Sequence, residues 1–220
     1  LTAQAAADGL TVRSTPNSGS FAKATGLRRH LQGNSVVEGM DVDLPFVVSP
    51  KDKDGEQLSY LLNRFDAYAA SSYPTVERRR TKSSIELKFT GTKLAYDIVP
   101  MLATEDNTWQ ILIKSDGTHR RTSVQRHVQF VRVRNKESDR HAGRVRYHEC
   151  VRLVKWWRDF KSAESSLSVP TFLVDLLCAA AFDAVGVQKT YEQTLAAWFG
   201  WLAHAVEQSQ RIAFSDFEAI

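Results

Sequence analysis

The sequence predicts an α+β protein with mixed α/β character: a mixed sheet in its first part and a lobe of helices in its last part. Strand-like alternation at 40–48, a hairpin pattern over 85–99 and strong helical periodicity after about residue 140 support this prediction. We expect two lobes, residues 1–139 and residues 140–220.

The composition is that of an ordinary soluble globular protein. The chain has 220 residues, of which 43% are hydrophobic and 25% charged, and its net charge of +4 favours anionic ligands. No apolar run approaches the roughly 20 residues of a membrane-spanning helix, and no signal pattern opens the chain, so we expect a cytoplasmic protein without membrane contact. The chain starts at Leu1 and stops in mid-pattern, which indicates trimming at one or both ends.

The first lobe contains alternating and helical patterns in turn. Residues 1–14 read as the end of a helix, and turn formers at 14–20 predict a loop. Leucine and aromatic residues recur at helical spacing over 56–68, which predicts a helix covering one face of the sheet. Segments 85–89 and 93–99, linked through Thr90-Gly91-Thr92, predict a hairpin.

Further signals are weaker. A short strand is expected at 111–113, and Arg78-Arg79-Arg80 reads as a solvated run before a strand. Cys150 and Cys178 are the only cysteines and lie in helical patterns, so we expect packed, reduced thiols and neither disulfides nor a cysteine-rich zinc site.

The second lobe is expected to hold three helices. Pro170 stands near a helix start, and Thr190 with Gln193 has the pattern of a capping box. Four of the five tryptophans follow helical periodicity and are expected in the core; they are Trp156, Trp157, Trp198 and Trp201. One helix is expected to be enveloped except for a polar seam formed by Arg144, His148, Arg152, Lys155 and Asp159.

Three aspartates form the strongest candidate site. Asp41 and Asp43 alternate with Val42 and Leu44, so they share one face of a strand, with α-carbons about 6.6 Å apart. Alone, such a pair is usually surface decoration. Asp97 lies in another strand with a similar apolar setting, so three carboxylates meet if the strands are adjacent. Such a cluster suits two magnesium or manganese ions acting in phosphoryl transfer.

Two further features fit a nucleotide. Gly19 and Ser20 offer backbone N–H groups and a hydroxyl one loop before the acidic strand, and Gly19 has no Cβ to block a phosphate. A solvated face is the usual meaning of the polar seam. With an acidic metal site elsewhere, its Lys155 becomes a candidate for binding a triphosphate.

Five motifs in order resemble one family. The chain is similar to the bacterial cyclic-oligonucleotide synthases of the cGAS/DncV-like nucleotidyltransferase (CD-NTase) family, relatives of cyclic GMP-AMP synthase and oligoadenylate synthase. The resemblance spans nearly the whole chain. Its motifs are Gly19-Ser20 with Thr25, Asp41-Val42-Asp43-Leu44, Tyr96-Asp97-Ile98-Val99-Pro100, Leu153-Val154-Lys155-Trp156-Trp157 and Val169-Pro170-Thr171-Phe172-Leu173-Val174.

The resemblance implies a polymerase β-like nucleotidyltransferase lobe followed by a helical lobe, with the active site in the cleft between them. It makes the three aspartates metal ligands, places Ser20 at a phosphate and Lys155 at the triphosphate, and sets Thr171 near the nucleotide. The chain departs from the family pattern at Asp175, where glutamate is common, and at Ala24, where glycine is common.

The implied activity is the conversion of nucleoside triphosphates, ATP among them, into a cyclic di- or trinucleotide second messenger. The reaction uses two magnesium ions, releases pyrophosphate and serves anti-phage (CBASS) signalling, with a regulatory partner protein encoded nearby. No cysteine and histidine cluster supports activation by duplex DNA. Two alternatives stay open: the same chemistry with a linear oligonucleotide or nucleotidylated acceptor as product, and a catalytically silent nucleotide-binding scaffold.

Overall fold

The computed structural model describes residues 1–27, 29–32, 35–38, 41–49, 58–91, 94–141, 144–162 and 169–208. The chain divides into two compact units. Unit 1 holds the described residues within Leu1–Ala22 and Gly39–Val128, and unit 2 holds those within Lys23–Glu38 and Gln129–Glu218. The lobe boundary expected after residue 139 stays a prediction. Three predicted elements begin at residues that lie outside the described ranges: the strand from 40, the helix from 56 and the strand from 93. The final segment of the chain also lies outside the described residues.

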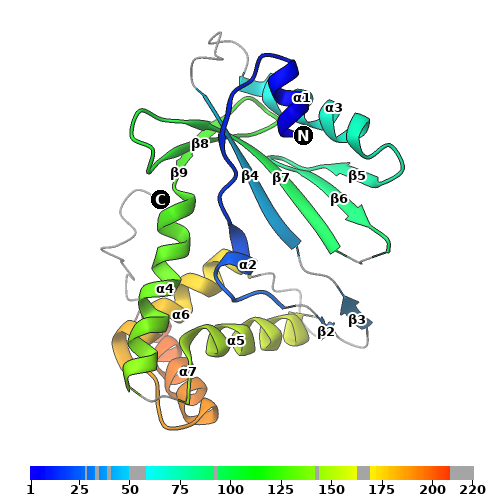
Figure 1. Cartoon of the computed structure of the whole chain (residues 1–220). Helices are drawn as coiled ribbons and strands as arrows, with labels where there is room; N and C mark the ends of the chain where they lie inside the picture. Colours follow the sequence, from blue (N-terminus) through cyan, green and yellow to red (C-terminus); the bar gives the residue numbers. More distant parts are fainter. Residues whose placement is uncertain are drawn as a thin grey trace. The chain divides into compact units, whose positions relative to one another are not determined.

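Unit 1 is built on a mixed sheet (Figure 1). Its elements are α1 (Thr2–Ala7), β1 (Val12–Ser14), α2 (Gly19–Ala22), β4 (Asp41–Val48), α3 (Leu58–Ser72), β5 (Glu77–Arg80), β6 (Ile85–Phe89), β7 (Leu94–Ala103), β8 (Gln110–Ile113), β9 (His119–Thr122) and the start of α4 (Val124–His141). The strand order is β1-β4-β7-β6-β5, and β8 pairs with β7 and β9.

The long strand β7 is the centre of this sheet. It pairs in parallel with β4 over Ala95–Leu102, which occupies one of its edges. Its other edge pairs antiparallel with β6 in its first half and with β8 in its second half. The hairpin expected from 85–99 is confirmed as β6 and β7, and the two aspartate-bearing strands are adjacent, as three converging carboxylates require.

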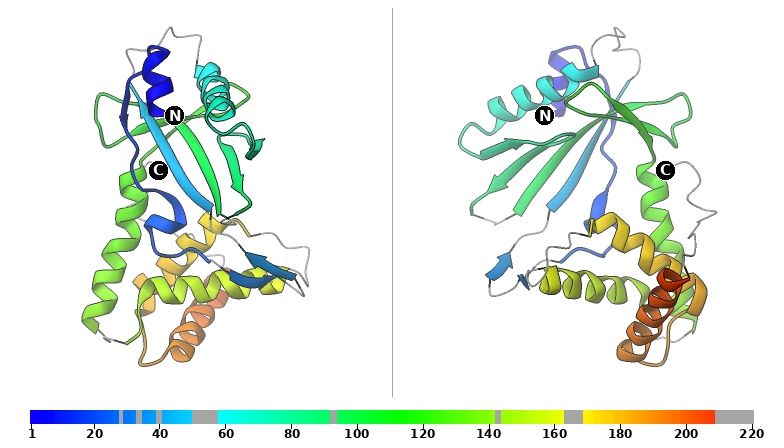
Figure 2. Two further views of the ribbon diagram at one scale, coloured as in Figure 1. Left: turned by 45° about the vertical axis from the view of Figure 1, so that its right-hand side comes forward. Right: turned by 180° about the vertical axis from the view of Figure 1, so that it is seen from behind.

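Helix α3 packs on one face of the sheet, against β6, β7 and β8 (Figure 2). Its Leu62 and Phe65 are fully buried, and Phe65 meets Phe46 of β4 at 5.1 Å between ring centroids. Helix α1 is tied to α3 because Arg64 Nε donates to Asp8 Oδ2 at 2.8 Å. The predicted amphipathic helix therefore forms, and it covers the apolar face.

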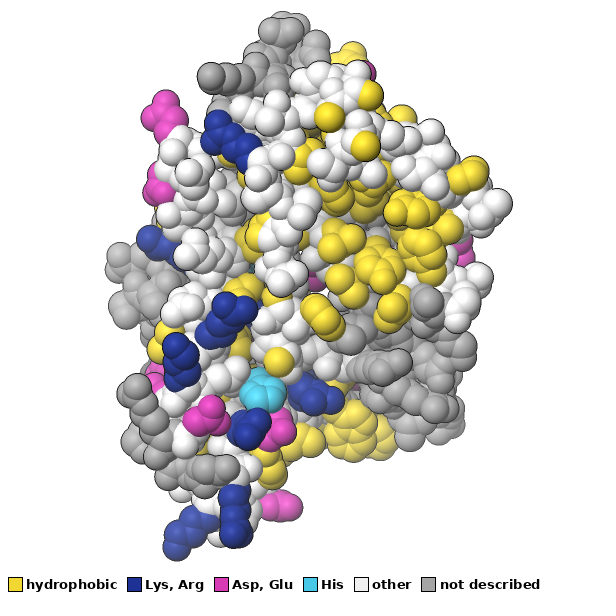
Figure 3. Space-filling view, viewed as in Figure 1, with side chains coloured by type: hydrophobic (Ala, Val, Ile, Leu, Met, Phe, Trp, Pro, Cys, Tyr) yellow, Lys and Arg dark blue, Asp and Glu magenta, His cyan; other side chains and the backbone are white. Residues whose placement is uncertain are grey.

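Part of this apolar face reaches the surface. The rings of Tyr73, Phe89 and Tyr96 follow one another edge to face at 5.6 and 5.4 Å. Figure 3 shows hydrophobic side chains gathered at the surface on the side where β6 and β7 lie.

Unit 2 combines helices with a small hairpin. Its elements are the rest of α4, β2 (Arg29–Gln32), β3 (Ser35–Glu38), α5 (Tyr147–Ser162), α6 (Thr171–Val185) and α7 (Tyr191–Glu207). Tyr147, Phe182 and Trp198 form an aromatic centre of its core. Thr190 caps α7 by accepting from the Gln193 amide at 3.3 Å, so the predicted cap is confirmed. In the described part of the chain, no helix is long and apolar enough to span a membrane.

Several elements differ from expectation. Val12–Ser14 is a strand rather than the end of a helix, because its backbone pairs with β4. The three arginines at 78–80 are exposed, as expected, but they form the edge strand β5. Helix α4 is amphipathic yet was not predicted, because charged residues interrupt its apolar positions. Cys150 and Cys178 are buried free thiols, as expected.

Helix α5 differs from two predictions: the exposed polar seam and the burial of its tryptophans. It buries a single stripe at helical spacing, and this stripe contains Lys155, which is only 2% exposed. The opposite side carries Trp156 and Trp157, which are 41% and 44% exposed rather than core residues. Arg144 lies before the helix begins. The prediction that α5 is enveloped except for a polar seam is wrong, because the helix packs on one side only. Lys155 lies on that packed side.

The packing of α3 can be tested by comparing two aromatic residues of that helix. Phe65 is fully buried and Tyr60 is 55% exposed. We expect Phe65→Ala to lower the free energy of unfolding by about 3–5 kcal/mol, because it removes buried area and leaves a cavity. Tyr60→Ala should change it by less than about 1 kcal/mol. Urea denaturation measures both, and equal losses would contradict the placement of α3.

Candidate active site

The backbone register brings the three predicted aspartates to one face of the sheet. In the parallel pairing of β4 with β7, Asp43 is the partner of Asp97, and Asp41 is the partner of Ala95. Side chains two residues apart in a strand point to the same side, so Asp41 joins the other two. The opposite side carries the neighbours that pack on the core, such as Leu44 and Tyr96.

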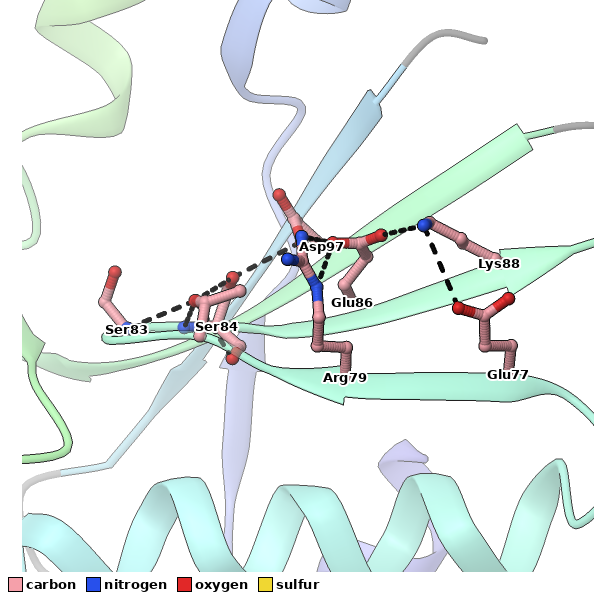
Figure 4. Close-up of polar contacts among 8 residues, drawn as sticks. Glu77, Arg79, Ser83, Ser84, Glu86, Lys88 and Asp97 are labelled. Atoms are coloured by element: carbon pink, nitrogen blue, oxygen red, sulfur yellow. Dashed lines mark hydrogen bonds and ion pairs between the residues drawn. The ribbon is translucent and has the colours of Figure 1, made fainter.

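A fourth carboxylate lies in the same row, and it was not predicted. Glu86 of β6 is the partner of Asp97, and Arg79 of β5 is the partner of Glu86. Arg79 Nε donates to Glu86 Oε2 at 3.2 Å, and Lys88 Nζ lies 3.3 Å from Glu86 Oε1 (Figure 4). Alternation of charged and apolar residues over 85–89 was the available signal. Glu86 is therefore already neutralised by two cations.

Two of the aspartates have a less favourable electrostatic setting than Glu86. Partial burial raises the pKa of Asp41, and the negative charge of Glu86 raises it further. Burial also raises the pKa of Asp97, with Asp41 adding repulsion, while the Ser84 hydroxyl at 3.3 Å from Asp97 Oδ1 opposes the shift. Carboxylates that repel one another on one face are a donor set that suits a divalent cation.

The side chains as they lie do not by themselves define an ion position. Among the described residues, no three histidine, cysteine, aspartate or glutamate side chains are grouped closely enough to hold a metal ion. The fit to magnesium therefore rests on the strand register and on the oxygen chemistry of the donors. The metal-ligand role of Asp41, Asp43 and Asp97 stays a prediction.

Helix α2 approaches the acidic face closely at one residue. Gly19 has a φ of +66°, in the left-handed region, and a Cβ built on it would lie 1.6 Å from Asp43 Oδ2. Only glycine is compatible with this approach. Ser20 follows in the same short helix and is partly exposed. The predicted pair thus lies beside one of the predicted metal ligands, although its role toward a phosphate stays a prediction.

Unit 2 contains the basic part of the predicted site. Lys155 Nζ lies 2.7 Å from Asp175 Oδ1 and donates to Thr25 Oγ1 at 3.0 Å. Lys23 pairs with the other oxygen of Asp175. Burial lowers the pKa of Lys155, and the negative charge of Asp175 opposes that shift. Lys23 was not singled out from the sequence; Asp175, an acid in the apolar helix α6, was the available signal that a buried cation is near.

Thr171 is the first residue of α6 and is exposed. Its Oγ1 accepts from Arg158 Nη1 at 3.0 Å, and the same nitrogen donates to the Val169 carbonyl at 3.2 Å. Arg158 also pairs with Asp159. The start of α6 is therefore held by α5, which fixes the threonine hydroxyl in place.

Residues 3–135 match the model of the Second Messenger Oligonucleotide or Dinucleotide Synthetase (SMODS) domain. The chain belongs to this family. It is 29% identical over 206 residues to the cyclic AMP-AMP-AMP synthase of Escherichia coli strain MS 115-1, covering 90% of this chain and 59% of that protein. It is 27% identical over 194 residues to the CBASS oligonucleotide cyclase CdnC of E. coli strain KTE188, covering 84% and 56%. The SMODS chain thus spans under two thirds of these relatives.

Solved structures agree with this assignment. The structure of E. coli MS115-1 CdnC with ATP has a TM-score of 0.71 at 26% identity, covering 98% of this chain and 65% of that one. Vibrio cholerae DncV with nonhydrolyzable GTP has a TM-score of 0.70 at 18% identity, covering 90% and 52%. The expected CD-NTase resemblance and polymerase β-like fold are confirmed.

The close approach of Gly19 to Asp43 can be tested on stability. Gly9→Ala and Gly19→Ala both place a side chain at positive φ, which costs about 1–2 kcal/mol. Nothing lies within 4 Å of a Cβ at Gly9, whereas the Asp43 carboxylate must move for Gly19→Ala. We expect Gly19→Ala to cost at least about 1 kcal/mol more in urea denaturation. Equal losses would show that α2 does not lie against β4.

Proposed function

We propose that this SMODS protein is a nucleotidyltransferase that makes a cyclic di- or trinucleotide second messenger for anti-phage signalling. The observation that supports this most is the register that places Asp43 beside Asp97, with Asp41 on the same face and Gly19 against Asp43. Relatives named as a cyclic AMP-AMP-AMP synthase and as a CBASS oligonucleotide cyclase support the product class.

In the proposed reaction, a ribose hydroxyl attacks the α-phosphate of a nucleoside triphosphate and pyrophosphate leaves. Asp41, Asp43 and Asp97 would hold two magnesium ions, which supply charge neutralisation and lower the pKa of the attacking hydroxyl. Because Gly19 has no Cβ, the backbone of α2 can lie against Asp43. Ser20, the next residue, offers its hydroxyl and amide to a phosphate of the nucleotide. Lys155 binds the triphosphate as a cation, and Thr171 lies near the nucleotide.

We propose ATP as one of the substrates and a regulatory protein as a partner. The structure of E. coli MS115-1 CdnC with ATP supports the substrate. A second structure, of the E. coli MS115-1 CdnC:HORMA-deltaN complex, supports a partner; it has a TM-score of 0.67 at 28% identity and covers 94% of this chain and 61% of that one.

The proposal is tested with radiolabelled triphosphates and magnesium. Asp41→Ala with Asp43→Ala should lower product formation at least about a thousandfold, because the donors to both cations are lost. Asp139→Ala, at an exposed aspartate of α4, is the matched control and should keep full activity. Product formation by the double variant at the wild-type rate would rule out this site.

Treatment of the product with phosphatase separates the possible products. A cyclic nucleotide keeps its chromatographic position, because it has no terminal phosphate to lose. A shift would indicate a linear oligonucleotide or a nucleotidylated acceptor. Nucleotide binding without pyrophosphate release, under any metal or partner tried, would favour a silent scaffold.

A further inference from the structure

Two lysines and one aspartate form a buried cluster in unit 2. Asp175 of α6 uses one carboxylate oxygen for Lys155 of α5 and the other for Lys23, which follows α2. The side chains of Lys23, Lys155 and Asp175 are 10%, 3% and 2% exposed. Thr25 accepts from Lys155, and the Phe172 ring centroid lies 5.9 Å from Lys23 Nζ.

The charges of this cluster do not balance among the described residues. There, two ammonium groups share one carboxylate, which leaves a net charge of +1 on a largely buried cluster. The charged and titratable groups acting most strongly on Lys155 are Asp175, Lys23 and Cys178 among the described residues. Burial raises the pKa of the Cys178 thiol far above neutrality, so it contributes no negative charge. A buried excess cation is unfavourable unless an anion completes it.

Asp175 also determines where the two ammonium groups lie. Each lysine pairs with a different oxygen of one carboxylate, so Asp175 holds both ammonium groups at a single side chain. A polyphosphate presents several closely spaced anionic oxygens, which two adjacent cations can bind together. The carboxylate alone, without the lysines, would repel such a ligand.

We propose that Lys23 and Lys155 form a cation pair that binds the triphosphate, with Asp175 as the positioning residue that holds both. This inference rests on the proposed function and adds two residues to it. Lys23 lies three residues after Ser20 in the sequence, so the segment that resembles the family's phosphate motif supplies a cation as well as a hydroxyl.

The first test compares ATP with adenosine as ligands of the chain, by calorimetry. Lys23→Met removes one cation and relieves repulsion at Lys155, so the variant should fold. We expect its Kd for ATP to rise about tenfold, the scale of one charge-assisted contact, with the Kd for adenosine unchanged. Lys136→Met, at an exposed lysine of α4, should match the wild type for both ligands.

The second test follows the Kd for ATP from pH 7.5 to 9.5. Asp175→Asn removes the charge that keeps Lys155 protonated, so the pKa of Lys155 should fall and ATP affinity should be lost at a lower pH than in the wild type. Asp175→Glu keeps the charge and should restore the wild-type profile. In the described part of the chain, the charged and titratable groups that act on Lys155 are Asp175, Lys23 and Cys178.

The outcomes separate the two proposals. If Lys155→Met weakens ATP binding while Lys23→Met and Asp175→Asn behave as wild type at every pH, the cation pair is overturned and the proposed function stands. If Lys155→Met also has no effect, the proposed role of Lys155 falls too. Should Asp175→Asn not fold, Lys23→Met decides: equal loss of ATP and adenosine binding, with a lowered Tm, would show a purely structural cluster.

Discussion

The parallel pairing of β4 with β7 is the constraint on which the candidate site depends. It makes Asp43 the neighbour of Asp97, and Asp41 follows on the same face. A slip of one residue would turn Asp97 toward the apolar face and expose Ile98, which is fully buried under α3. The packing of the core therefore also determines the arrangement of the acids, and α2 can approach only because Gly19 lacks a Cβ.

Unit 2 differs from unit 1 because its charged cluster of Lys23, Lys155 and Asp175 is buried in the packing of the helices. A helix as apolar as α6 tolerates Asp175 only with cations beside it, and it has two of them. Helical geometry was enough to select Lys155 from the sequence, but it placed this lysine on the wrong side of α5. Lys23 could not be assigned, because its partner Asp175 is 152 residues away in the sequence.

Local patterns were sufficient for the strongly periodic elements of the fold. The alternation before Val48, the hairpin at 85–99 and the cap at Thr190 were predicted because each depends on near neighbours. The edge strands were not predicted. β1 is only three residues long and pairs with β4, which is distant in the sequence, and β5 consists of four charged residues without apolar alternation. Glu86 was missed because its place beside Asp97 depends on the register of the hairpin.

We propose above that the three aspartates of this SMODS protein bind divalent cations. Titration with Mn²⁺, followed by electron paramagnetic resonance in the presence of a non-hydrolysable triphosphate, tests it most directly. Asp97→Asn should weaken Mn²⁺ binding at least about tenfold. Glu86→Gln, the next residue in the same row but already paired with Arg79, should bind like the wild type. Unchanged Mn²⁺ binding by Asp97→Asn would contradict the account.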